Sequence, residues 1–358
     1  MEQAELLASA VPPLIEWYRK NRRTDLPWRQ DVTPYRVWIS EIRLQQTRIE
    51  TVVPYYVRFL QRLPDAACLA VVPEDELMKL WEGLGYYSRA RNLKKAAGVV
   101  MAEHGGELPR TAEELRRLPG IGDYTAGAIA SIACGEPAPA VDGNVLRVLA
   151  RLTESDGDVT KEKTKKQAAE RLREVYPSGR EAGLLTEGLM ELGETVCIPN
   201  GTPLCSLCPW RDLCLCRAHG TQSDYPVRAA KKERRMERLT VLLLEREGRF
   251  ALCRRPPSGL LAGLWQMPNV PGTRTEEEVL RAVEDLGLIP ESVRPAGRSR
   301  HLFSHVEWHM TGWLIRCREE KGAGDGGLSW FSPEEIRGAV ALPAAFRYWR
   351  KKITENGD

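Results

Sequence analysis

The sequence predicts a mainly α-helical N-terminal region followed by a smaller α+β domain. Apolar residues recur at helical spacing through most of the N-terminal region, and residues 118–127 are typical of a tight turn between two helices. Further on, two short apolar runs flank Glu247-Gly248, followed by a helical pattern near 276–287 and strand patterns near 300–317. We therefore expect three segments: residues 1–220, a polar and basic linker at 221–238, and residues 239–350.

Charge and hydropathy set only broad limits on function. The 358-residue chain has 52 Lys and Arg against 49 Asp and Glu, a formal net charge of +3, so only local patches could attract nucleic acid. No apolar run approaches the ~18 residues of a membrane span, and the acidic N-terminus lacks a signal-peptide core. We expect a soluble, cytoplasmic monomer with no membrane partner, nucleoid-associated if the source is prokaryotic.

A candidate acid lies on an early helix. The hydroxyl of Thr33 and the ring of Pro34 favour a helix start at this point. Tyr35 and Trp38 then belong to an apolar stripe, and Glu41 lies at its edge. Burial beside aromatic side chains favours the neutral carboxyl, which is the form that a general acid needs. A solvated surface glutamate is the alternative for Glu41 taken alone.

The turn at 118–127 is the centre of the helical region. A capping-box pattern opens the helix before it, which should run to about Leu118. Gly120 and Gly122 let the backbone turn where side chains would clash, and amides exposed near a helix N-terminus suit a phosphate oxygen. We interpret the turn as a site that binds a nucleic-acid backbone. The acidic residue Asp142 follows it shortly after in the sequence. An ordinary helix–helix turn is the alternative.

The loop at 83–87 combines small residues with two tyrosines and precedes a basic helix. Aromatic side chains beside cations suit a wedge between bases with nearby phosphate contacts. Tyr86 is the candidate wedge, and a tyrosine pair packed in the core is the alternative.

Four of the nine cysteines, Cys197, Cys205, Cys208 and Cys214, are spaced C-x7-C-x2-C-x5-C. In a chain that we expect to be cytoplasmic, such a cluster favours a metal site over disulfides. Four thiolates suit either an iron–sulfur cluster or zinc, so spacing alone does not choose the metal. Cys216, at the end of the segment 197–216, could replace Cys214 as the fourth ligand.

Taken in order, these motifs resemble those of the helix-hairpin-helix DNA glycosylases, and most closely the adenine-specific MutY branch. The resembling segments are residues 38–47, 83–92, 118–127, 141–144, the cysteine cluster and residues 303–305. The resemblance implies a monofunctional base-excision repair enzyme that flips adenine, paired with 8-oxoguanine or G, out of duplex DNA and hydrolyses its glycosidic bond. It also implies that the four cysteines bind a [4Fe–4S] cluster, although the first cysteine gap is one residue longer than usual.

The resemblance implies roles for individual residues. Glu41 protonates N7 of adenine and Asp142 stabilises the cationic sugar, while Tyr124 and Asn144 orient these groups. The other implied contacts are Trp28, Arg29 and Glu187 with adenine; Gln46, Tyr86, Gly120 and Gly122 with DNA; and Phe303, Ser304 and His305 with 8-oxoguanine. Arg43 departs from the methionine expected within the glutamate motif, so local DNA contacts could differ.

The C-terminal domain resembles a Nudix domain at residues 258–268. The Arg-Glu-x-x-Glu-Glu helix that holds metal in Nudix hydrolases is missing, so pyrophosphatase chemistry is not expected. We expect a Nudix-like fold that reads the lesion base without hydrolysing it.

The sequence leaves two alternative functions open. An endonuclease III-like glycosylase/lyase on oxidised pyrimidines carries a lysine where Tyr124 stands, and a phenol cannot form the required Schiff base. The second alternative is a non-catalytic DNA-binding protein. It requires that Glu41 and Asp142 face away from a common pocket.

Overall fold

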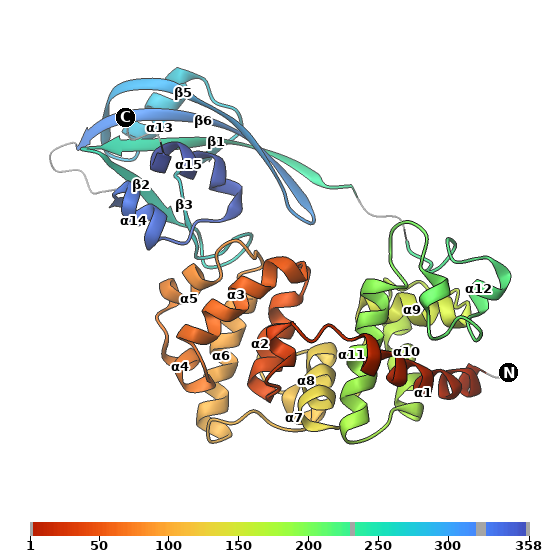
Figure 1. The fold of residues 1–358 in the computed structure, drawn as a ribbon. Helices are drawn as coiled ribbons and strands as arrows, with labels where there is room; N and C mark the ends of the chain where they lie inside the picture. Colours follow the sequence, from red (N-terminus) through yellow and green to blue (C-terminus); the bar gives the residue numbers. More distant parts are fainter. Residues whose placement is uncertain (1–2, 230–232, 320–326, 356–358) are drawn as a thin grey trace. The chain divides into compact units, whose positions relative to one another are not determined.

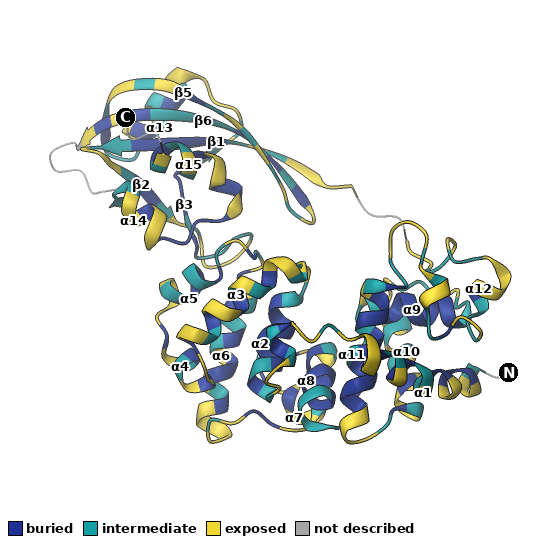
Figure 2. Ribbon diagram, viewed as in Figure 1, coloured by how far each residue is buried: buried dark blue, intermediate teal, exposed yellow. Residues whose placement is uncertain are grey.

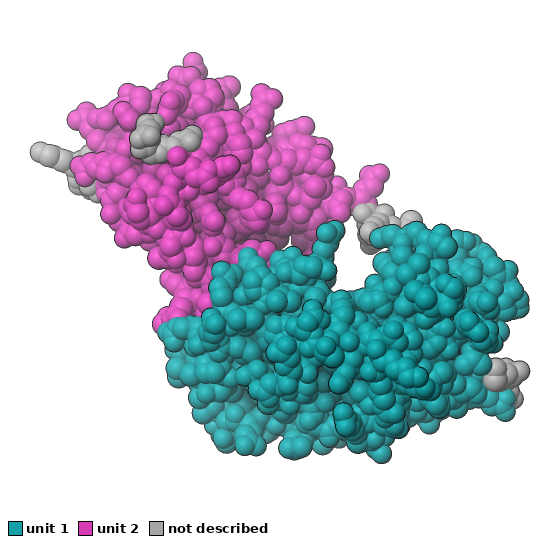
Figure 3. Space-filling model, viewed as in Figure 1, with its two compact units in different colours: residues 1–72, 91–230 teal, residues 73–90, 231–358 magenta. Residues whose placement is uncertain are grey.

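The computed structural model describes residues 3–229, 233–319 and 327–355, which form two compact units (Figures 1 and 3). Unit 1 comprises Met1–Val72 and Arg91–Ala230, and unit 2 comprises Pro73–Ala90 and Lys231–Asp358. The segment 73–90 therefore groups with the C-terminal part of the chain. Residues 230–232 of the expected linker, which include Lys231 and Lys232, lie outside the described residues.

Unit 1 is helical, as predicted. Its elements are α1 (Gln3–Asn21), η1 (Pro27–Arg29), α2 (Pro34–Leu44), α3 (Ile49–Arg62), α4 (Ala66–Val71), α6 (Ser88–Glu103), α7 (Ala112–Leu115), α8 (Asp123–Cys134), α9 (Gly143–Thr153), α10 (Glu162–Val175), α11 (Arg180–Thr195), η2 (Cys205–Leu207) and α12 (Leu215–His219).

The helices that frame the site pack closely. Helix α8 contacts α2 and α11, and α11 also contacts α1 and α9. Most residues of α8 and α11 are buried (Figure 2). Gly127 makes one close approach possible, because a Cβ there would lie only 2.4 Å from the Pro139 carbonyl oxygen. This packing brings distant parts of the chain around one cleft.

The predicted helix starts and ends are largely confirmed. Thr33 caps α2, and its hydroxyl accepts a hydrogen bond from the Arg36 amide at 3.2 Å. The helix before the hairpin ends at Leu115 rather than Leu118. Its capping box is incomplete, because Glu114 accepts from the Thr111 hydroxyl at 2.9 Å instead of from the backbone of the cap.

Unit 2 contains a seven-stranded mixed sheet with the core order β3-β2-β1-β6-β5; β4 pairs with β1, and β7 pairs with β2. Strands β1 and β6 are parallel, and the other pairs are antiparallel. Its elements are α5 (Glu74–Leu80), β1 (Arg235–Arg246), β2 (Arg249–Arg254), β3 (Trp265–Gln266), β4 (Asn269–Pro271), α13 (Glu276–Glu284), β5 (Leu288–Leu302), β6 (Val306–Glu319), β7 (Leu328–Phe331), α14 (Pro333–Gly338), η3 (Ala344–Phe346) and α15 (Arg347–Glu355).

Two apolar clusters stabilise unit 2. One includes Trp308, Phe346 and Trp349, and the other includes Val279 and Ile315. Strand β1 begins at Arg235, four residues before residue 239, where the sequence predicted the start of the C-terminal domain. Within the described ranges, no helix has the length and apolar character needed to cross a membrane.

Candidate active site

Glu41 is buried on α2, with 5% of its surface exposed. The Tyr124 hydroxyl on α8 donates a hydrogen bond to its carboxyl at 2.5 Å. Burial raises the Glu41 pKa to about 7; the hydrogen bond from Tyr124 lowers it and the charge of Asp142 raises it. Glu41 is therefore a buried carboxyl that can hold its proton near neutral pH.

Asp142 caps the N-terminus of α9. Its carboxylate accepts a hydrogen bond from the Val145 amide at 2.8 Å. Burial raises the Asp142 pKa, while backbone hydrogen bonds and the guanidinium of Arg147 oppose that shift. The charge of Asp142 is one of the causes that raise the Glu41 pKa.

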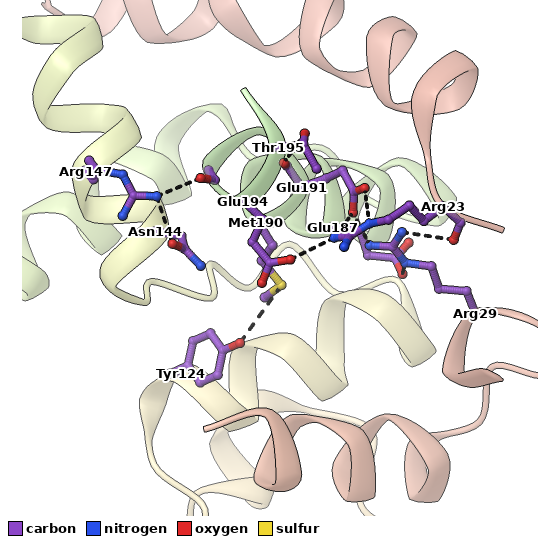
Figure 4. Close-up of polar contacts among 11 residues, drawn as sticks. Arg23, Arg29, Tyr124, Asn144, Arg147, Glu187, Met190, Glu191, Glu194 and Thr195 are labelled. Carbon is purple, nitrogen blue, oxygen red and sulfur yellow. Dashed lines mark hydrogen bonds and ion pairs between the residues drawn. The ribbon is translucent and has the colours of Figure 1, made fainter. Parts of the chain in front are cut away.

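Arg147 connects three backbone segments around Asp142. Its guanidinium donates to Asn144 Oδ1 at 2.9 Å, to the Gly193 carbonyl at 2.7 Å and to the Cys197 carbonyl at 2.9 Å. Figure 4 shows the bond between Arg147 and Asn144. Asn144 is thus held next to Asp142 by a buried cation.

A second charged group surrounds Arg29. Arg29 donates to Glu191 at 2.7 Å and lies 3.6 Å from a Glu187 oxygen, so two expected pocket residues do meet. Burial raises the Glu187 pKa; burial also opposes ionisation of Glu191, but Arg23 and Arg29 outweigh it and lower that pKa. The third expected pocket residue, Trp28, is buried with its ring edge-on to Tyr56.

A cleft of about 950 Å³ in unit 1 is lined by Gly120 and Gly122 of the turn between α7 and α8, here called the hairpin, and by Tyr124. Gly120 has φ +79°, and a Cβ there would lie 2.6 Å from that of Asn92, so glycine is required by the fold. Gly122 has φ −94° with open space around it, so its conformation does not itself require glycine. Both glycines are exposed.

The two candidate DNA-wedging side chains are exposed and lie in different units. Gln46 follows α2 with φ +59°, and Tyr86 has φ +47° with 48% of its surface exposed. Arg89 stacks over the Tyr86 ring at 5.5 Å. The neighbouring Tyr87 is buried, so the packed-core alternative holds for Tyr87 and not for Tyr86.

The four clustered thiols line one cavity together with Arg151. Cys216 does not line it and is fully buried elsewhere, which favours Cys214 as the fourth ligand. Among the described residues, no three Cys, His, Asp or Glu side chains form a single-ion site. In a [4Fe–4S] cluster each thiolate would bind a different iron, so four thiolates need not converge on a single ion.

Residues 303–305 form the turn between β5 and β6 in unit 2. The Phe303 ring packs edge-on against Trp308 at 4.9 Å and His301 at 4.5 Å. Ser304 and His305 are exposed, with Oγ and Nδ1 3.3 Å apart. The aromatic residue anchors the turn and the two polar side chains remain accessible.

Sequence reasoning missed Arg23, Glu191 and Glu194. Arg23 binds Glu191 through two nitrogens, at 2.6 and 3.0 Å, and Glu194 at 2.7 Å. The available signal was the recurrence of acidic residues at positions 187, 191 and 194 on an otherwise apolar helix, a spacing that places them on one face.

Comparison with known proteins agrees with this geometry. Residues 39–174 match the HhH-GPD superfamily base excision DNA repair protein family, and residues 240–351 match the NUDIX domain. Among solved structures, a thermostable thymine-DNA glycosylase is 28% identical with a TM-score of 0.53, covering 61% of this chain and 97% of that one. A non-covalent endonuclease III–DNA complex, at 24% identity and a TM-score of 0.52, covers 63% and 98% and shares the fold.

The fold, the matched repair family and the curated relatives define a helix-hairpin-helix DNA glycosylase of base-excision repair. Adenine DNA glycosylase from Homo sapiens is 35% identical over 94% of this chain and 72% of that protein, and its Mus musculus counterpart is 34% identical over 94% and 76%. The chain belongs to the adenine DNA glycosylase family. The endonuclease III-like alternative is not better supported.

Proposed function

We propose that this protein excises adenine from duplex DNA where it is mispaired with 8-oxoguanine or G. The observation that carries the proposal is the buried Glu41, bonded to Tyr124 and electrostatically coupled to Asp142. The adenine DNA glycosylase names of the relatives support adenine as the leaving base. A base inside a duplex must leave the stack before side chains can reach it.

In the proposed mechanism Glu41 donates its proton to N7 of the flipped adenine. The protonated base becomes a better leaving group, and positive charge develops on the sugar as the glycosidic bond breaks. Asp142 stabilises that charge, directly or through a transient covalent bond, before water completes the hydrolysis. Tyr124 and Asn144 orient the two acids.

Arg29 and Glu187 would line the adenine pocket, with Trp28 forming part of its wall. Arg29 offers donors, and the raised pKa of Glu187 lets its carboxyl donate or accept. These groups suit the nitrogen-rich edge of a purine.

The hairpin would bind the DNA backbone through amides near Gly120 and Gly122. The open space around Gly122 leaves room for a phosphate to approach the backbone. The exposed Gln46 would insert into the DNA stack, and the exposed Tyr86 would act as a wedge beside the lesion base.

Cys197, Cys205, Cys208 and Cys214 would hold a [4Fe–4S] cluster in the cavity that they share. A bound cluster would cross-link the cysteine loop through its iron–thiolate bonds. Arg147 and Arg151 already join that loop to α9, by donating to the Cys197 and Ile198 carbonyls at 2.9 Å.

Ser304 and His305 would read the base opposite adenine. Their exposure, with Phe303 anchored beneath them, supports a role in recognising 8-oxoguanine.

The deciding experiment is single-turnover excision on four duplexes, with A opposite 8-oxoguanine, G, C or T. We expect rapid release of adenine opposite 8-oxoguanine, slower release opposite G, and little opposite T. No release of adenine from any of the four duplexes would overturn the proposal, and release of an oxidised pyrimidine from a fifth duplex would then support the endonuclease III-like alternative.

A further inference from the structure

Helix α11 brings a third carboxylate toward the two catalytic acids. The Met190 sulfur lies 4.0 Å from the Tyr124 hydroxyl, and Glu194 is one helical turn further along the same face. Figure 4 shows the Glu194 carboxylate directed at Arg23, near Met190. Its side chain retains 35% exposure, so solvent screens it only in part.

The backbone of α11 is fixed against the segment that carries Asp142. A Cβ on Gly193 would lie 2.8 Å from the Asn144 Cβ, so glycine permits this close approach. Arg147 then bonds both the Gly193 carbonyl and Asn144. The backbone that carries Glu194, the next residue, is therefore fixed by packing, and the ion pair with Arg23 at 2.7 Å orients its side chain.

The three acidic side chains on this face of α11 share two bonded guanidinium groups. Arg23 is shared between Glu191 and Glu194, and Arg29 lies between Glu191 and Glu187. The charge of Arg22 also acts on Glu187. Negative charge near a carboxyl favours its protonated form, and partial burial preserves part of that effect.

The groups that act on the two acids come from every surrounding element. Those acting on Glu41 are Tyr124 of α8, Asp142 at the start of α9, and Glu187 and Glu194 of α11. Those acting on Asp142 are the amides of Asn144 and Val145, Arg147 of α9 and Glu194 of α11. The charge of Glu194 acts on both acids.

We propose that Glu194 is a positioning residue of the active site, whose charge, partly balanced by Arg23, keeps the proton on Glu41 and sets the upper pH limit of excision. It touches no reacting atom and acts through Glu41. This inference rests on the proposed function, since Glu41 must be the proton donor for its protonation to govern the rate.

The test compares Glu194→Gln, which removes the charge at nearly constant shape, with Glu194→Asp, which retains it. Glu181→Gln is the matched control, because Glu181 is on the same helix and pairs with Arg19 at 2.8 Å away from the site. Single-turnover excision of adenine opposite 8-oxoguanine is measured across the pH range at low and high salt.

We expect Glu194→Gln to move the alkaline limb of the profile to lower pH by about 0.5 to 1 unit at low salt, and by less at high salt. Glu194→Asp and Glu181→Gln should follow the wild type. NMR titration of the Glu41 carboxyl carbon, assigned with Glu41→Gln, should show the same downward shift without any need for activity.

The outcomes separate the two hypotheses. If wild type excises adenine but the Glu194→Gln profile and Glu41 titration match the wild type, the role of Glu194 is wrong. If the Glu41 titration shifts but wild type releases no adenine, the electrostatic role stands and the proposed function fails.

Discussion

The Tyr124 hydroxyl donates to the Glu41 carboxyl at 2.5 Å, joining residues 83 positions apart in the chain. Burial favours the neutral form of Glu41, whereas this hydrogen bond favours the ionised form. The opposing effects leave the Glu41 pKa at about 7. A general acid works best when its pKa lies near the operating pH, so the contact suits Glu41 to proton donation.

Glu41→Gln and Asp142→Asn should each abolish excision while leaving DNA binding largely intact. Loss of a proton donor alone lowers a rate by ~10²–10⁴. The measurement is single-turnover excision together with a binding titration. Glu16→Gln, an exposed partner of Lys20, is the control. Near wild-type rates in either variant would remove that acid from the mechanism.

Glu41→Gln should also stabilise the protein at neutral and alkaline pH. In the native state Glu41 keeps a proton up to about pH 7 that the unfolded chain releases near 4.5. Wild-type stability therefore falls as pH rises through this window, by up to about 3 kcal/mol above it. Urea unfolding at acidic and at alkaline pH checks this. If Glu41→Gln is no more stable than the wild type at alkaline pH, ionisation of the buried Glu41 does not destabilise the native state as expected.

The enzyme should show no efficient lyase activity, because Tyr124 cannot form a Schiff base with the sugar. Borohydride reduction during reaction with a substrate duplex should give little covalent protein–DNA complex on a denaturing gel. If strong trapping occurs and persists in Tyr124→Phe, a lysine elsewhere performs lyase chemistry and the endonuclease III-like alternative gains support.

Purified protein should be brown and contain roughly four irons per chain. Cys214→Ser should lose iron, since its sulfur lines the shared cavity, whereas Cys216→Ser should retain it. Metal analysis and the visible spectrum of each variant make the comparison. One zinc and no iron per chain would show that the four cysteines form a zinc site instead. Iron loss in Cys216→Ser but not in Cys214→Ser would make Cys216 the fourth ligand.

Replacing both Ser304 and His305 with Ala should reduce the preference for adenine opposite 8-oxoguanine over adenine opposite G. One or two hydrogen bonds to a base give about 1–3 kcal/mol of discrimination, roughly ten- to a hundred-fold in rate ratio. Iron content and A:G excision should change little. An equal loss on both duplexes would show that the turn supports the fold instead.

The sequence alone was enough to predict the features that depend on neighbouring residues. The Thr33 cap, the turn at Gly120 and the cysteine spacing follow from local backbone and ligand preferences. The alternation of strands and helices after β1 likewise follows from local periodicity. The family resemblance then supplied the roles of Glu41 and Asp142, which no local pattern specifies.

Only the tertiary structure decided which distant residues meet. Arg23 and Glu194 are separated by 171 positions, and packing buries Cys216 while Cys214 lines the shared cavity. The grouping of residues 73–90 with unit 2 also has no signal in local composition. Local propensities act within a few residues, whereas burial, shared cavities and electrostatic fields arise when packing brings separate segments together.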